Sequence, residues 1–69
     1  MLRMAVESTN VASIGYDTAS QTLEVEFHDG RVYQYFDVPE SLHEEFLRAP
    51  SKGRFLQAEI KGHFRYARL

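Results

Sequence analysis

Residues 22 to 28 alternate strictly between polar and apolar side chains, reading Thr-Leu-Glu-Val-Glu-Phe-His. An alternation with a period of two is typical of a strand that buries one face. The pair Asp29-Gly30 follows at once, and it is favoured in a two-residue type I′ turn because both central positions of that turn need positive φ. Residues 31 to 36 then supply the aromatic and β-branched side chains that are common in strands. The pattern predicts a β-hairpin.

A two-residue turn also fixes the pairing of the two strands, with Phe27 opposite Val32 and Leu23 opposite Phe36. One face of this hairpin is expected to enter the core, and it carries Leu23, Val25, Phe27, Val32, Gln34 and Phe36. The other face is expected to be partly wet, and it carries Glu24, Glu26, His28, Arg31, Tyr33 and Tyr35. In this register both tyrosines of the second strand lie opposite acidic side chains.

Further elements must cover the apolar face, because an isolated two-stranded hairpin is only marginally stable in water. Residues 11 to 16 alternate weakly and are predicted to form a third strand, whereas residues 1 to 8 are expected to be loosely ordered. Residues 63 to 69 alternate again, and their pattern fits either an edge strand or an extended tail laid across the domain.

Two short helices are predicted after the hairpin. Pro39 suits the first turn of one helix, and the apolar positions behind it, at spacings of four and three, are Leu42, Phe46 and Ala49. This helix should end before Pro50, since the residue before a proline is pushed out of the α region. Ser51 can cap a second helix that runs to Gly62. The predicted fold class is α+β: a three-stranded antiparallel meander followed by two short helices, with residues 63 to 69 as an edge strand or tail.

The length and composition favour one folded domain over residues 1 to 69, because 43% of the residues are hydrophobic and only 26% are charged. The absence of cysteine excludes a disulfide framework and a thiolate zinc site. No apolar run is long enough for a signal peptide or a membrane span, so a cytoplasmic location without membrane association is expected.

Charge is distributed unevenly along the chain. Residues 1 to 47 hold two basic and nine acidic side chains, whereas residues 48 to 69 hold six basic and one acidic. Such asymmetry fits either a surface for a polyanion or two oppositely charged parts that attract each other within the fold.

Several short segments occur together in an order that resembles the KTSC domain, a module named for the C-terminus of some lysyl-tRNA synthetases that also occurs as a free-standing small bacterial protein. The segments are Ser13-Ile14-Gly15-Tyr16-Asp17, Asp29-Gly30-Arg31-Val32-Tyr33-Gln34-Tyr35, Val38-Pro39 and Ser51-Lys52-Gly53. The resemblance runs from about residue 8 to the end of the chain. It implies a domain of unknown biochemical function, for which RNA binding is suggested by the link to the synthetase, and it brings no catalytic residues.

The candidate RNA-binding residues are aromatic and basic. Tyr33 and Tyr35 share one face of their strand, where they can stack on successive unpaired bases or, alternatively, pack within the fold. The basic candidates are Arg31, Lys52, Arg54, Lys61 and Arg65. Ser51 and Gly53 at a helix start are candidates for anion binding through backbone N–H groups, with a capped and solvated helix as the alternative.

No enzyme chemistry is indicated. His43 begins the sequence His-Glu-Glu-Phe-Leu, in which a leucine occupies the place of the second histidine of a His-Glu-x-x-His zinc motif, so metal binding is not expected. No nucleophile, base and orienting group occur in a recognisable pattern, and no cofactor is expected. The first hypothesis is an accessory module that binds RNA weakly, either tRNA or a single strand. The second is a protein interaction module that uses the tyrosine face or an exposed sheet edge, as a monomer or a weak homodimer.

Overall fold

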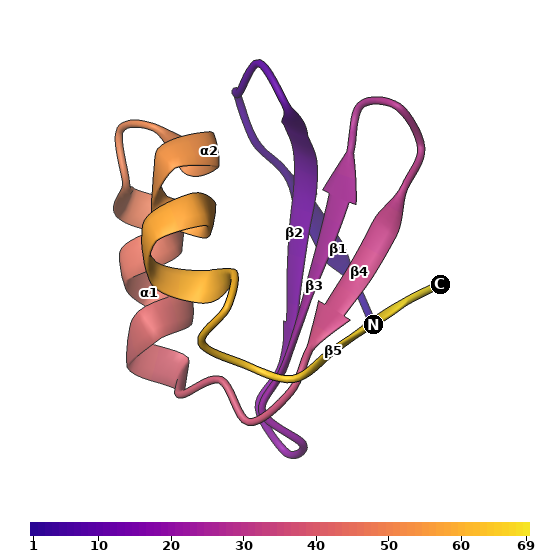
Figure 1. Cartoon of the computed structure of the whole chain (residues 1–69), viewed down its shortest axis with the longest axis vertical. Coiled ribbons are helices and arrows are strands. Elements are labelled where there is room, and N and C mark those ends of the chain that lie inside the picture. Colours follow the sequence, from indigo (N-terminus) through magenta and orange to yellow (C-terminus); the bar gives the residue numbers. More distant parts are fainter.

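Five antiparallel strands form one sheet in the computed structural model, which covers residues 1–69 (Figure 1). The strands are β1 (Arg3–Ala5), β2 (Val11–Asp17), β3 (Thr22–Phe27), β4 (Val32–Tyr35) and β5 (Tyr66–Arg68). They lie side by side in the order of the chain, so β1 and β5 form the two edges of the sheet.

The helices cover one face of this sheet (Figure 1). They are α1 (Glu40–Arg48), α2 (Lys52–Phe55) and a turn of π-helix that continues α2, η1 (Leu56–Ile60). The Ser51 hydroxyl accepts a hydrogen bond from the backbone N–H of Arg54 at 3.3 Å, which confirms the predicted cap of the second helix. None of the helices combines the length and the apolar character that a membrane-spanning helix needs.

The α+β class and the order of strands before helices are confirmed, but the predicted three-stranded meander is too small. Of the two alternatives for residues 63 to 69, the edge strand is the one observed: β5 pairs with β4 and extends the sheet. β1, a strand that the sequence pattern did not predict, pairs with β2 at the other edge, within the segment of residues 1 to 8 that was expected to be loosely ordered. All three residues of β1 are exposed, and a strand without a buried face leaves no alternation for sequence analysis to detect.

The turn between β3 and β4 is one residue longer than the sequence predicts. The backbone N–H of Phe27 donates to the carbonyl oxygen of Arg31 at 2.9 Å, which makes His28, Asp29 and Gly30 the loop. Gly30 has φ +93°, whereas Asp29 is not among the residues with positive φ, so a type I′ turn is excluded. A three-residue loop that ends in a left-handed glycine is the next most common hairpin connection.

This extra residue shifts the register by one position and exchanges the two faces of β4. Leu23 lies opposite Tyr35, and Val25 lies opposite Tyr33, so the predicted pairing of Leu23 with Phe36 was wrong. Both tyrosines of β4 therefore lie on the helix-covered face of the sheet. Val32 and Phe36, which were predicted to be core residues, are only half-buried.

The core lies between the sheet and the helices. Its ten buried apolar residues are Val11, Ile14, Leu23, Val25, Phe27, Tyr35, Val38, Phe46, Leu56 and Ile60. Phe46 from α1 and Leu56 and Ile60 from η1 bring the helices onto the strands. Burial of such side chains stabilises a domain by about 1.5–3 kcal/mol each relative to exposure, so this layer is the main source of stability in a chain without disulfides.

Candidate nucleic-acid interface

Three tyrosines form a cluster at the β4–β5 edge of the helix-covered face. The ring centroid of Tyr33 lies 6.3 Å from that of Tyr35 and 5.8 Å from that of Tyr66, and Tyr35 and Tyr66 are 6.0 Å apart. Tyr35 is only 2% exposed, Tyr33 is half-buried and Tyr66 is 62% exposed. Burial, and then the neighbouring Tyr33 and Tyr66, raise the pKa of the Tyr35 hydroxyl. Tyr66, which sequence analysis did not select, is thus the most accessible ring of the cluster.

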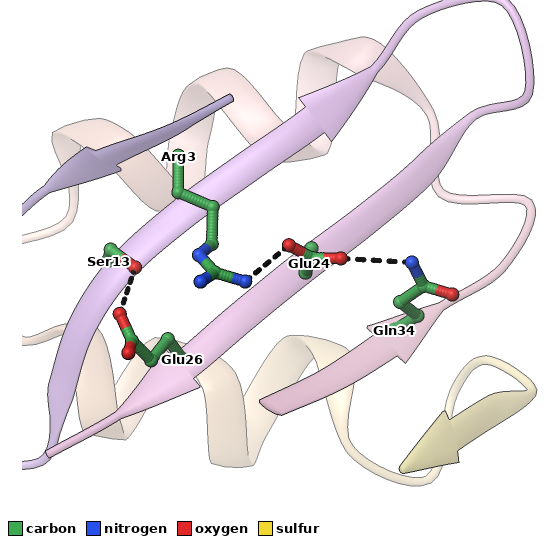
Figure 2. A network of polar contacts seen from close by, with 5 residues as sticks. All are labelled: Arg3, Ser13, Glu24, Glu26 and Gln34. Atoms are coloured by element: carbon green, nitrogen blue, oxygen red, sulfur yellow. Dashed lines mark hydrogen bonds and ion pairs between the residues drawn. The ribbon is translucent and has the colours of Figure 1, made fainter. Parts of the chain in front are cut away.

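The acidic residues of β3 lie on the opposite, helix-free face of the sheet, which we call the open face (Figure 2). Glu24 pairs with Arg3 and accepts a hydrogen bond from the side-chain amide of Gln34 at 2.9 Å. Glu26 accepts a hydrogen bond from the Ser13 hydroxyl at 2.7 Å. The prediction that these carboxylates lie beside Tyr33 and Tyr35 was wrong, and the cause is the one-residue shift in register.

A polar groove lies where α2 and η1 approach the β1–β2 loop and the β3–β4 turn. It consists of two adjoining hollows of about 560 and 440 Å³ that share Thr9, Asn10, Gly53 and Gln57 as lining residues. Four basic side chains line this basic groove, namely Arg31, Lys52, Arg54 and Lys61, against two acidic ones, Glu7 and Asp29. The groove therefore has an excess of positive charge in a chain whose net charge is −2.

The four cations differ in how free they are to bind a ligand. Arg54 and Lys61 make no side-chain hydrogen bond or ion pair within the chain. The Lys52 ammonium donates a hydrogen bond to the carbonyl oxygen of Ala49, the C-cap of α1, at 2.6 Å, so it already has a partner in the chain. Arg54 and Lys61 are therefore the most available cations of the groove.

Arg31 has a partner in the chain, but one that a ligand can replace. Its guanidinium pairs with Asp29 at 2.7 Å and lies 5.0 Å from the centre of the Phe27 ring. The pKa of the Asp29 carboxyl is lowered, first because it accepts a hydrogen bond from the backbone N–H of Arg31, and also through the charges of Arg31 and Arg68. Since the pair is exposed to solvent, a competing phosphate meets only a modest electrostatic penalty there.

The remaining predicted residues have other surroundings. Arg65 pairs with Asp37 at 2.8 Å and lines a separate hollow beside Phe36, so the fold does not bring it into the basic groove. The hydroxyl of Ser51 is used by the helix cap, and Gly53 lies against the side-chain amide of Asn10.

The fold adds residues that sequence reasoning missed. Asn10 and Gln57 line both hollows of the groove. Arg68 was visible in the sequence as one of the six basic side chains of residues 48 to 69, but its place was not: it lies opposite Tyr33 in the pairing of β4 with β5, close enough to Asp29 to lower the pKa of that carboxyl. The alternation of residues 63 to 69 was the available signal, but it did not say which strand the segment would join. No group of three or more histidine or acidic side chains is arranged to hold a metal ion.

Comparison with known proteins identifies the family. A family model described as the KTSC domain matches residues 7–64. The chain belongs to the KTSC domain family. This confirms the resemblance seen in the sequence. The matched residues include all those that line the basic groove, from Glu7 to Lys61.

Relatives of this KTSC domain occur both within larger proteins and alone. The lysine–tRNA ligase of Trichormus variabilis is 43% identical over 63 residues, which make up 91% of this chain but 11% of the ligase. An uncharacterized protein of Stutzerimonas stutzeri is 41% identical over 70 aligned positions, covering 100% of this chain and 99% of that protein. The crystal structure of a KTSC domain protein from Yersinia pestis has a TM-score of 0.93 at 43% identity, over 99% of this chain and 96% of that one.

Proposed function

We propose that this KTSC domain is an accessory module that binds the phosphate backbone of RNA in the basic groove. The observation that carries the proposal is the position of Arg54 and Lys61, two cations without a partner in the chain, along one groove of net positive charge. Cations without an internal partner can exchange their counterions for phosphates at little structural cost. A groove lined by such cations suits an extended polyanion.

The position of the acidic residues supports the same function. In the register predicted from the sequence, Glu24 and Glu26 repel phosphates from the tyrosines. In the observed register these carboxylates lie on the open face and are bound to Arg3, Gln34 and Ser13. The helix-covered side, which contains the groove, is thereby separated from them by the thickness of the sheet.

The relatives provide independent support. A lysine–tRNA ligase contains a region similar to nearly the whole chain. A module that binds RNA can strengthen the binding of tRNA by such an enzyme. A free-standing copy can bind RNA through the same groove. We extend this RNA context to the present domain as part of the proposal.

Titration of a labelled single-stranded RNA and of tRNA, followed by fluorescence anisotropy, tests the proposal. With three phosphates neutralised by Arg31, Arg54 and Lys61, the logarithm of affinity for a single strand should fall with the logarithm of salt concentration with a slope of about 2. Lys61→Gln and Arg54→Gln should each weaken binding and reduce that slope by about 0.7.

Arg48→Gln is the matched control. Arg48 is an exposed arginine in the last turn of α1 that lines none of the hollows, so its removal changes the net charge equally without altering the groove. Equal weakening by Arg48→Gln and Arg54→Gln would show non-specific attraction in place of a groove. No binding of either RNA at about 50 mM salt would refute the proposed function.

A second candidate function is protein interaction at the β1 edge. Met1, Leu2 and Met4 are 53%, 95% and 65% exposed beside the unpaired edge of a short strand. Such an edge can accept another strand. Sedimentation equilibrium of the native chain and of Met4→Lys tests this candidate, since a dimer that forms by strand addition there should dissociate when a charge is placed on the edge.

A further inference from the structure

A hollow of about 280 Å³ adjoins the basic groove at the β4–β5 edge. It is lined by Tyr33, Tyr35, Tyr66, Lys61 and Gly62, and we call it the tyrosine hollow. Lys61 lines both this hollow and the groove, so the two share one cation.

The rings of the tyrosine hollow form a supported surface. Tyr35 is buried beneath the other two rings, and Tyr33 is held on its other side by an edge-to-face contact with Phe27 at 5.8 Å. Tyr66 lies on this support and remains largely exposed. A ring that is already held in place loses little freedom when a planar ligand stacks on it.

The charges around the tyrosine hollow favour an anionic ligand. No acidic residue lines the hollow, and the ammonium of Lys61 has no partner in the chain. Arg68 on β5 lies directly opposite Tyr33 on β4 and adds a second positive charge nearby. An aromatic ring beside free cations matches a nucleotide, which joins a flat base to a phosphate.

On the basis of the proposed function, we propose that the tyrosine hollow holds one unpaired nucleotide of the bound RNA, with its base stacked on Tyr66 and its phosphate at Lys61. Bases within a duplex have both faces covered by their neighbours, so only an unpaired or terminal base can occupy the hollow. The hollow thus makes the domain selective for single-stranded RNA, whereas the groove alone recognises only the backbone.

Two RNA hexamers of equal charge test this proposal, one with adenine on every ribose and one with no bases. The full chain should bind the adenine hexamer about 5- to 150-fold more tightly, because stacking of one base on one ring contributes a factor of that size. Tyr66→Leu should reduce the affinity for the adenine hexamer to that for the abasic one. Tyr66→Phe, which keeps the ring and removes only the hydroxyl, should retain the difference.

The outcomes separate this proposal from the proposed function. Equal binding of both hexamers, weakened by Lys61→Gln but not by Tyr66→Leu, would overturn the stacking site and leave the groove as the RNA site. Failure of both hexamers to bind at about 50 mM salt would overturn the stacking site and the proposed function together. Loss of the base preference in Tyr66→Phe as well as in Tyr66→Leu would also contradict stacking, since the aromatic face is still present.

Discussion

Arg3 reaches Glu24 by crossing Gly15, so that β1 and β3 are connected over the strand between them. The Arg3 guanidinium lies 2.5 Å from the Glu24 carboxylate, whose side chain is 8% exposed (Figure 2). A Cβ on Gly15 would lie 2.8 Å from Cγ of Arg3 and 2.7 Å from the carbonyl oxygen of Leu2. The absence of a side chain at Gly15 is therefore what allows the ion pair to form on the open face.

Gly15→Ala should displace β1 and destabilise the fold by about 1–3 kcal/mol, because neither the backbone of Leu2 nor the stem of Arg3 has room for a methyl group. Urea denaturation gives the free energy of unfolding, and amide exchange at residues 3 to 5 reports on β1 itself. Gly53→Ala is the control: its added Cβ would lie 3.4 Å from Asn10, and alanine favours a helix by about 0.5–1 kcal/mol. Equal stability of the Gly15→Ala variant and the native chain would show that β1 does not need the glycine.

The register of the hairpin predicts opposite effects for two residues of β4. Tyr35→Ala should cost about 3–5 kcal/mol in the free energy of unfolding, because it removes a ring that is 2% exposed. Val32→Ala should cost much less, since Val32 lies on the open face and is half-buried. Thermal and urea denaturation of both variants measures the difference. A larger cost for Val32→Ala would favour the register predicted from the sequence.

His43 predicts a pH dependence of stability. Its ring stacks on Tyr16 at a centroid distance of 4.5 Å. Burial lowers the pKa of His43 below 6.5, and the charges of Glu40 and Glu44 oppose this shift only in part. The unfolded chain therefore takes up a proton at a higher pH than the folded chain. This contribution to stability is fully present above the unfolded pKa and is lost as the pH falls from the unfolded pKa through the lower, folded pKa.

His43→Phe, which keeps a ring against Tyr16, should flatten the curve of unfolding free energy between about pH 7 and pH 5. His63→Gln is the control, since His63 is exposed and its ring forms a hydrogen bond with the Ala58 carbonyl. An unchanged slope in His43→Phe would exclude His43 as the source of the pH dependence.

Sequence patterns predict most of the elements because those elements bury one face. β3 and α1 show clear periodicity and β2 a weak alternation, and Pro39, Pro50 and Ser51 mark the ends of the helices. The register of β4 could not be predicted, because the sequence Val-Tyr-Gln-Tyr-Phe places apolar side chains on both faces of the strand. Asp29-Gly30 does not resolve the ambiguity, since the same pair fits a two-residue turn and a three-residue loop.

The candidate site was predictable only as a set of residue types. The basic character of residues 48 to 69 is visible in the sequence, but the partner of each cation is not. Lys52 binds the end of α1 and Arg65 pairs with Asp37, contacts that depend on the path of the chain between elements. Tyr66 joined the tyrosine cluster because β5 pairs with β4, and no local signal specified that pairing.

Chemical-shift mapping of a short single-stranded RNA on the isotope-labelled domain tests the central claim most directly. If the basic groove is the RNA site, the backbone amides that shift on titration should cluster at Gly53, Gln57 and Lys61 and extend to Tyr66. The amides of Glu24 and Gln34, whose side chains are hydrogen-bonded to each other on the open face, should shift least. Shifts concentrated at β1 or at the Glu24 network, or no shifts at all, would contradict the account.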